Sequence, residues 1–162
     1  MQNPKFINIA SHLTDMSNLQ PQTTALAVPC GNAKDGNIDY KSYTFQQLEL
    51  DSSRIAYGLE QIGIKRGVRT VLMVKPGMDY FALVFALFKI GAVMVMVDPG
   101  MGIKNLKQCL DESKPEAFIG IPKAHIARML FKWGNKTNRI NVVAGFRLPG
   151  TDATLNDIRE IG

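Results

Sequence analysis

The chain has 162 residues, of which 46% are hydrophobic and 20% are charged, a composition that excludes a globally disordered protein. This length suits one well-packed domain and is too short for two sizeable ones. Cys30 and Cys109 have no CxxC or Cys/His spacing, which excludes a disulfide framework and a recognisable zinc motif. We therefore expect a reducing, cytoplasmic setting. The N-terminus also lacks the basic stretch and apolar core of a signal peptide.

The net charge of +5 is unevenly distributed along the chain. Residues 117–151 contain no Asp or Glu, and the basic residues among them are Lys123, Arg128, Lys132, Lys136, Arg139 and Arg147. Such a basic stretch, at 123–147, could attract an anionic partner. We favour the more ordinary interpretation, a solvated helix face with its flanking loop, and expect no nucleic-acid partner.

The first predicted elements are a helix and a hairpin. Residues 8–19 carry apolar side chains at helical spacing, with Asn8 or Ser11 available as the cap. Residues 23–29 and 41–45 predict two short strands. We expect them to pair around the turn-rich loop that separates them.

A regular alternation of helices and strands follows. Thr44 is expected to cap a helix over residues 46–62, whose apolar face consists of Leu48, Ile55, Leu59 and Ile62. The predicted strands beyond it cover residues 69–74, 92–97, 117–121 and 140–144. Predicted helices begin near residues 79 and 103 and cover residues 122–133 and 154–161. Pro122 suits the first turn of its helix, where no backbone N–H is needed.

These elements predict an α/β protein with a doubly wound, mainly parallel sheet and flanking helices, plus the short N-terminal helix and β-hairpin. Strands that are apolar on both faces are typical of parallel sheets covered by helices on each side. The crossovers should be right-handed. We predict a single partial domain over residues 1–162: a helix and strand at 1–36, an α/β core at 37–146, and an incomplete C-terminal segment at 147–162.

Residues 80–97 approach the length and apolarity of a membrane span, because Lys89 is the one charged residue among them. Lys89 and Gly91 lie at the centre of the stretch, however, and the composition changes there from aromatic and Leu/Ala-rich to Val/Met-rich. This change favours a buried helix followed by a buried strand. We expect no stable membrane span.

Three loops are candidate ligand sites, because ligands of open parallel sheets bind beyond the carboxyl ends of the strands. They are residues 75–77, 98–102 and 122–125. The loop at 98–102 (DPGMG) has two glycines and precedes a helix, so its amides could approach a phosphate or carboxylate. It matches neither GxGxxG nor the P-loop pattern, and Asp98 would repel an anion. A tight turn is the favoured interpretation.

The sequence shows no Ser-His-Asp, HExxH or paired-carboxylate arrangement. His12 is expected to be a surface or partly packed residue, and His125 is expected to titrate near neutral pH without a catalytic partner. Phe131 and Trp133 among basic residues suggest base stacking, although their spacing favours core packing. We assign no catalytic, cofactor-binding or metal-binding residue to this chain.

Residues 43–121 resemble the N-terminal part of the adenylate-forming (AMP-binding) superfamily, which includes the acyl-CoA synthetases. The resemblance rests on packing and turn positions, namely Thr44, Phe45, Leu48, Ala56, Leu59, Gly63, Lys89, Gly91, Ala92 and Pro99. The chain departs from the family pattern at Val68, where an Asp is usual, and at Asp98, where an Asn is usual. The DPGMG loop and the PEAFIGIPKAH stretch are similar to a bacterial branch that includes olefin β-lactone synthetases and long-chain acyl-AMP ligases.

The resemblance implies a parent enzyme that activates a carboxylic acid, of the fatty or hydroxy-fatty class, with ATP and Mg²⁺. The family's phosphate-binding loop, its aromatic–Thr–Glu motif, its ribose-binding Asp and its catalytic Lys have no counterpart in residues 1–162. We therefore predict a scaffold portion that forms one wall of the acyl pocket and is inactive alone. Its expected partners are the remainder of the adenylating enzyme and the carboxylic acid substrate.

Two alternatives stay open at this point. One is a stand-alone, flavodoxin-like binding module that uses residues 123–147 to hold an anionic partner. The other is a self-associating fragment, because a partial sheet exposes an edge and an apolar surface.

Overall fold

The computed structural model describes residues 8–32 and 38–162. Residues 1–7 and the centre of the predicted hairpin turn, residues 33–37, lie outside the described part. The helices are α1 (Ser11–Leu19), α2 (Phe45–Gln61), α3 (Met78–Ile90), α4 (Ile103–Ser113), α5 (Pro122–Phe131) and α6 (Leu155–Ile161), with a 3₁₀ turn η1 (Pro99–Met101). The strands are β1 (Thr24–Asn32), β2 (Ile38–Thr44), β3 (Arg69–Met73), β4 (Val93–Val95), β5 (Ala117–Gly120), β6 (Ile140–Val143) and β7 (Ala153–Thr154).

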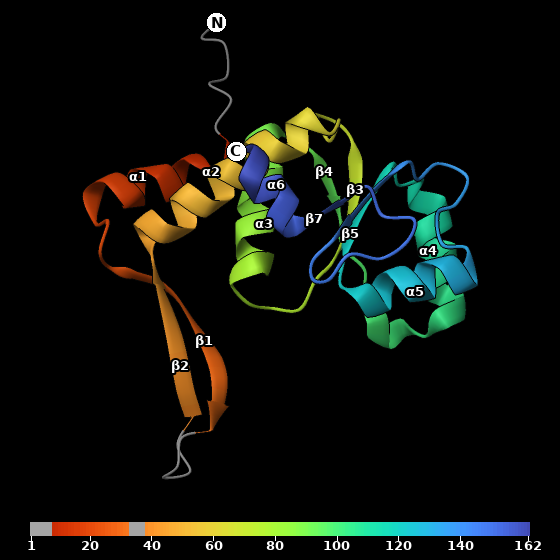
Figure 1. The fold of residues 1–162 in the computed structure, drawn as a ribbon, viewed down its shortest axis with the longest axis horizontal. Helices are drawn as coiled ribbons and strands as arrows, with labels where there is room; N and C mark the ends of the chain where they lie inside the picture. Colours follow the sequence, from red (N-terminus) through yellow and green to blue (C-terminus); the bar gives the residue numbers. More distant parts are fainter. Residues whose placement is uncertain (1–7, 33–37) are drawn as a thin grey trace, which may run out of the picture.

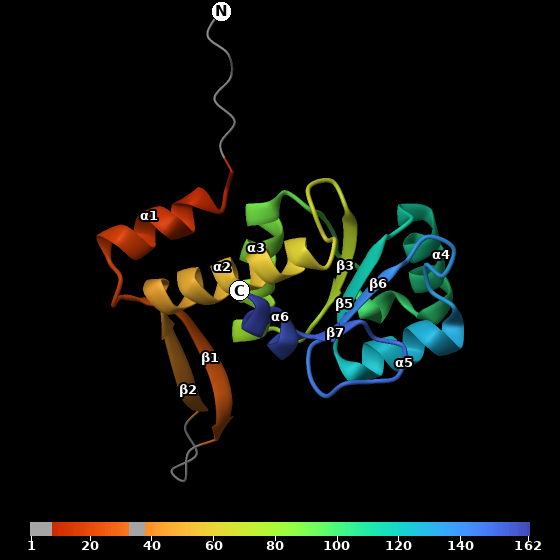
Figure 2. The ribbon, with the colours of Figure 1, turned by 45° about the horizontal axis from the view of Figure 1, so that its top comes forward.

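The body of the molecule is a five-stranded parallel sheet in the order β4-β3-β5-β6-β7 (Figures 1 and 2). The prediction of a parallel α/β sheet is confirmed. The register pairs Val71 of β3 with Val95 of β4 on one side and with Phe118 of β5 on the other. β4 is shorter than predicted because its pairing with β3 stops at Val95.

The two faces of this sheet have separate hydrophobic cores, so the sheet is doubly wound. Neighbouring strand residues point to opposite faces, as Val71 and Leu72 do. Leu72 packs in the core formed with α2, α3 and α6, whereas Val71 packs in the core formed with α4 and Trp133. Phe118 and Ile119 of β5 divide between the same two cores.

The helix boundaries have local causes. Thr44 and Gln47 form a capping box at the start of α2, as the backbone N–H of Gln47 donates to Thr44 Oγ1 (3.2 Å) and that of Thr44 donates to Gln47 Oε1 (2.9 Å). α3 ends where Gly91 takes the left-handed conformation, with φ of 70°. Asn8, one of two predicted caps, accepts the Ala10 N–H through its side chain, while Ser11 is the first helical residue.

The helix–strand transition predicted within residues 80–97 is confirmed, with α3 ending at Ile90 and β4 beginning at Val93. α3 has 13 residues. Among the residues that the structure describes, no helix is long and apolar enough to cross a membrane.

β1 and β2 pair antiparallel, as predicted, and both strands are longer than the sequence indicated. They form a separate two-stranded sheet that projects away from the body (Figures 1 and 2). Residues 38–42 of β2 are exposed to solvent. The pairing includes irregularities between Thr24 and Leu26 and between Pro29 and Gly31.

The C-terminal segment packs on the body of the molecule. β7 joins the sheet beside β6, and α6 packs directly on α2. Ile158 of α6 is fully buried in the core. Gly58 of α2 permits this contact, since a Cβ there would collide with the backbone carbonyl of Ile158. A second capping box, between Thr154 and Asp157, starts α6.

Candidate functional site

The strand order creates a switch point between β3 and β5. The chain leaves β3 through α3 toward β4 at the sheet edge, and α4 then carries it back past β3 to β5. Counted from β3, the order is that of flavodoxin-like sheets, in which ligands bind where the direction of winding reverses. The loops that follow β3 and β5 therefore diverge around a crevice.

A cavity of about 500 Å³ lies at this switch point. Its walls come from the end of β3, from the segments that follow β3, β4 and β5, from α3, α4 and α5, and from the residues that follow α5. The lining residues are Leu72, Met73, Val74, Lys75, Pro76, Tyr80, Met96, Val97, Leu106, Ile121, Lys123, Ala124, Ala127 and Trp133. Residues of two of the three predicted loops, 75–77 and 122–125, therefore line the same cavity. The third loop, 98–102, is not among the lining segments, although Met96 and Val97, which precede it, are.

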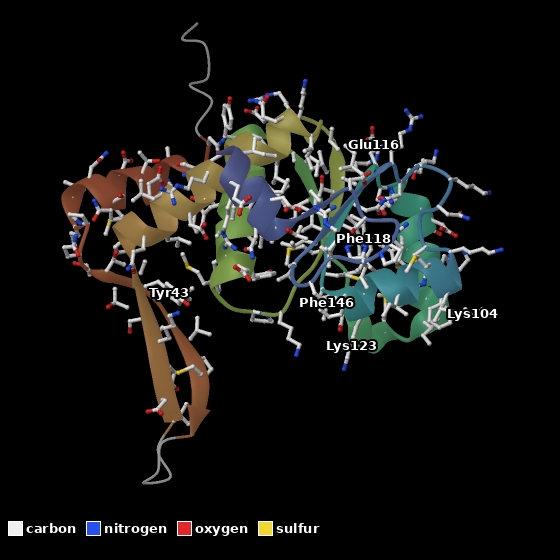
Figure 3. All side chains as sticks on the ribbon, viewed as in Figure 1. Tyr43, Lys104, Glu116, Phe118, Lys123 and Phe146 are labelled. Carbon is white, nitrogen blue, oxygen red and sulfur yellow. The ribbon has the colours of Figure 1, made fainter. Side chains whose placement is uncertain are left out.

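The crevice wall is apolar except at a few positions. The charged residues among those that line it are Lys75 and Lys123, both exposed and both positive. Figure 3 shows Lys123 near one end of β5 and Glu116 near the other. α5 begins beside Lys123 and has no acidic residue in its first turn, so the positive end of its dipole faces the same side. The site therefore favours an apolar ligand with a negative end group.

Trp133 lines the crevice and also belongs to the hydrophobic core, as its spacing in the sequence predicted. It is 5% exposed and packs with Val71, Leu110 and Phe118. Its indole Nε1 is buried and has no acceptor among the described residues. Phe131 stacks on its ring, with centroids 5.7 Å apart, but remains 38% exposed, so the core prediction is wrong for Phe131.

The DPGMG loop is a tight turn, the favoured prediction. Asp98 Oδ1 accepts the N–H of Gly100 at 2.7 Å, and the backbone N–H of Met101 donates to the carbonyl of Asp98. Gly102 has φ of 86°, which a glycine adopts readily, and α4 begins directly after it. The Asp98 carboxylate takes up an amide that a phosphate would need, so this loop does not fit the triphosphate of ATP.

His125 has a structural position, which differs from the expectation of titration near neutral pH. The ring is fully buried, its Nε2 lies 2.9 Å from the carbonyl oxygen of Val142, and its edge meets the Phe118 ring. Burial, with a smaller contribution from the charge of Arg128, holds the pKa of His125 below its usual range. His12 is exposed, as predicted.

The six basic residues of 123–147 do not gather on one face. Lys123 follows β5 and Arg139 precedes β6, so they stand at opposite ends of parallel strands. Arg128 lies over the Phe118 ring, 5.7 Å from its centroid, and burial lowers its pKa. Arg147 pairs with Asp157 at 2.5 Å. These four residues therefore lie in different local environments.

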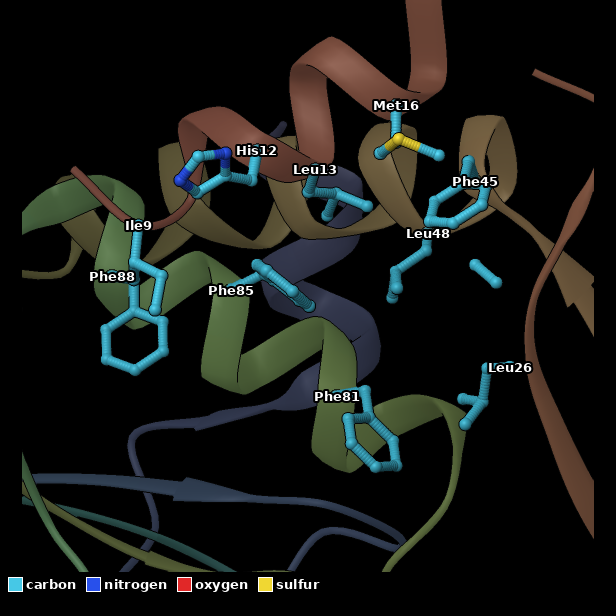
Figure 4. Close-up of a pocket in the computed structure, with 11 residues that line it drawn as sticks. Ile9, His12, Leu13, Met16, Leu26, Phe45, Leu48, Phe81, Phe85 and Phe88 are labelled. Carbon is cyan, nitrogen blue, oxygen red and sulfur yellow. The ribbon is translucent and has the colours of Figure 1, made fainter. Parts of the chain in front are cut away.

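A second hollow, of about 380 Å³, lies between α1, α2, α3 and β1 (Figure 4). Phe81, Phe85 and Phe88 of α3 line it from one side, and Leu13 and Met16 of α1 line it from the other. His12 stands at its rim (Figure 4).

The described residues contain no group of three or more His, Cys, Asp or Glu side chains that could hold a metal ion.

An open parallel sheet with an apolar crevice at its switch point is the arrangement in which many α/β proteins bind ligands. The family model of the AMP-binding enzymes matches residues 15–157. The chain therefore belongs to the AMP-binding enzyme family.

Two curated relatives are olefin β-lactone synthetases. The one from Stenotrophomonas maltophilia is 45% identical over an alignment of 162 positions, which covers 96% of this chain and 28% of that protein. The one from Xanthomonas campestris is 45% identical over 139 residues, covering 85% of this chain and 25% of that protein. The chain thus spans about a quarter of the length of these relatives.

Solved structures share the fold. A putative long-chain-fatty-acid CoA ligase from Rhodopseudomonas palustris superposes with a TM-score of 0.79 at 17% identity, covering 96% of this chain and 37% of that one. The anthranilate CoA ligase AuaEII has the same TM-score and identity, with coverages of 98% and 29%. The fold of this chain therefore matches about a third of each of these structures.

Proposed function

We propose that this chain serves an enzyme that activates a carboxylic acid with ATP. In that reaction the carboxylate displaces pyrophosphate from ATP and forms an acyl-adenylate. The observation that carries the proposal is the match of residues 15–157 to the AMP-binding enzymes. The apolar crevice with lysines at its mouth supports a carboxylic acid as the substrate.

The acid is of the fatty or hydroxy-fatty class. The 500 Å³ crevice has room for a hydrocarbon chain, and the 45% identical relatives are olefin β-lactone synthetases. With a 3-hydroxy acid, the hydroxyl would attack the activated carbonyl, close a four-membered lactone and release AMP. The proton of the hydroxyl would leave with the phosphate or a base.

The chain itself supplies scaffold and one wall of the acyl pocket. The described residues do not fit ATP or Mg²⁺: the DPGMG loop has its Gly100 amide occupied by Asp98, and no cluster of metal-ligating side chains is found among them. We therefore assign those roles to other residues of the enzyme. Taken alone, the 162-residue chain should show no acid-dependent ATP–pyrophosphate exchange.

A chimera tests the proposal directly. Residues 15–157 would replace the corresponding segment of the Stenotrophomonas maltophilia olefin β-lactone synthetase, and exchange would be measured with and without a long-chain 3-hydroxy acid. We expect acid-dependent exchange from the chimera and none from the isolated chain. A chimera that folds, shown by its thermal transition, but catalyses no exchange would contradict the proposal.

The cellular setting is proposed to be the cytoplasm, which the two free thiols of Cys30 and Cys109 support. The alternative of a stand-alone anion-binding module gains no support, because the basic residues that it needs are dispersed over the structure.

A further inference from the structure

We propose that the outer side of α5 docks on an anionic phospholipid surface. This side of the helix presents aliphatic side chains to solvent, and an exposed lysine stands at each of its ends. The contact takes no part in the adenylation reaction. The inference therefore goes beyond the proposed function and does not depend on it.

The apolar part of the surface is a stripe along α5. Ile126, Met129 and Leu130 are spaced three and four residues apart, which places them on one side of the helix, and all three are exposed. The other side of α5 faces the protein, where His125 is fully buried and Ala127 lines the crevice. Contiguous apolar surface of this kind marks a site of contact with a protein or a membrane.

The charge at the ends of the stripe is positive. Lys123 lies in the first turn of α5 and Lys132 follows its last residue, and both are exposed. Neither has an ion-pair partner among the described residues. Figure 3 shows Lys104, at the start of α4, on the same side of the molecule as Lys123. No Asp or Glu occurs in residues 117–151, so α5 and its flanking segments carry no carboxylate that would repel a phosphate.

The net charge of the whole chain has the same origin. Residues 101–151, which include α4 and α5, contain nine Lys and Arg against three Asp and Glu. The rest of the chain contains ten basic and eleven acidic residues. The net +5 therefore comes from the part of the chain that carries the stripe, and a negatively charged surface would attract this part first.

A lipid surface fits this combination of side chains better than a protein does. Protein interfaces are depleted in lysine and use Tyr, Trp and Arg as their anchors. At a membrane, aliphatic side chains enter the boundary of the acyl chains, while lysines reach the phosphates through their flexible stems. A second copy of the chain would cover the stripe at high protein concentration, but it would bring the lysines of two helices together.

Vesicle flotation tests the proposal, with the 162-residue chain and with the chimera that carries residues 15–157. The vesicles consist of phosphatidylcholine with or without phosphatidylglycerol, and the protein is kept at a concentration where sedimentation shows monomers. We expect both proteins to bind the anionic vesicles at least about tenfold more tightly than the neutral ones, and less tightly as salt is added. Equal binding to both kinds of vesicle, or none, would overturn the proposal. Binding by the chain but not by the chimera would show that the rest of the enzyme covers α5, and would overturn it as well.

The apolar contribution is tested by Leu130→Gln. This variant should raise the Kd for anionic vesicles about tenfold, because Leu130 would otherwise leave water on docking. The matched control is Leu19→Gln, at a residue that is 75% exposed and belongs to α1, which packs on α2 at the other face of the sheet. A Leu130→Gln variant that binds as the wild type does would show that charge alone accounts for binding, and would contradict docking through the stripe.

The charge contribution is tested by Lys123→Gln with Lys132→Gln. The pair should raise the Kd for anionic vesicles at least about tenfold. Lys41→Gln with Lys65→Gln makes the same change of net charge at exposed residues of β2 and of the segment before β3, and should change the Kd less than about twofold. An equal effect of both pairs would refute the role of α5. All variants are compared at an unchanged thermal transition, and because flotation needs no ATP, its outcome is separate from that of the exchange assay.

Discussion

The guanidinium of Arg159 in α6 donates two hydrogen bonds of 2.7 Å to the carboxylate of Asp51 in α2, which lies 108 residues earlier in the sequence. Nη2 of the same side chain also lies 2.7 Å from Oδ1 of Asp79, at the start of α3. The Arg159 side chain thus connects α2, α3 and α6, which cover the same face of the sheet. The hydrogen bonds to Asp51 and Asp79 raise the pKa of Arg159 further, so it stays charged at every pH of interest.

Replacing Arg159 with Met should lower the free energy of unfolding by about 2 kcal/mol, because Asp51, with 19% of its side chain exposed, would lose charged hydrogen bonds in a partly buried place. Urea denaturation measures the change. As control, Lys107→Met breaks an exposed pair within α4 and should cost about 0.5 kcal/mol or less. An equal loss of unfolding free energy in the two variants would contradict a larger contribution of the Arg159 ion pairs.

Gly58→Ala should destabilise the protein, although alanine normally stabilises a helix by about 0.5–1 kcal/mol relative to glycine. The added Cβ would collide with the Ile158 carbonyl and force α6 away from α2, at a cost of about 1–3 kcal/mol. Gln61→Ala, on an exposed turn of the same helix, should change stability by less than about 0.5 kcal/mol. A stabilising Gly58→Ala would contradict the close packing of α2 and α6.

His125 should make stability depend on pH. Its pKa is lowered in the folded state, so the unfolded chain binds more protons, and the free energy of unfolding falls as the pH drops below about 6.5. The slope from this residue can reach at most about 1.4 kcal/mol per pH unit. Denaturation at pH 7.5, 6.5 and 5.5 should show a steeper fall for the wild type than for His125→Gln. His12→Gln, at an exposed position, should keep the wild-type slope.

The outer face of α5 should promote self-association. Ile126, Met129 and Leu130 are 44%, 47% and 71% exposed and lie on one side of the helix. Contiguous exposed apolar surface favours contact between molecules. Sedimentation across a range of concentrations should show association of the wild type, and the double substitution Met129→Lys with Leu130→Lys should reduce it. A wild-type chain that stays monomeric throughout would contradict this expectation.

Local signals and one topological rule account for what the sequence predicted. Thr44 and Gln47 specify the start of α2 within four residues, and Gly91 ends α3 by its own conformational freedom. The rule that ligands bind beyond the carboxyl ends of parallel strands predicted three candidate loops, and the structure places residues of two of them, 75–77 and 122–125, in the wall of the crevice.

Features that depend on distant partners were missed. β7 has two residues, which are too few to show a strand periodicity in the sequence. It forms by pairing with Val142 and Val143 at the edge of β6. The burial of His125 depends on Phe118 and the carbonyl of Val142, neither of which its own helix reveals. The place of Trp133 in the crevice wall likewise follows from the turn after α5, not from its helical spacing.

The central claim, that the crevice holds the hydrocarbon chain of an acid that the enzyme adenylates, is tested most directly in the chimera. The measurement is the KM for the long-chain 3-hydroxy acid in ATP–pyrophosphate exchange, with and without Ala127→Phe, and with Lys65→Glu as the control substitution away from the crevice. We expect a KM at least about tenfold higher for Ala127→Phe and an unchanged value for Lys65→Glu. The same KM for this acid with a filled and an open crevice would contradict the claim.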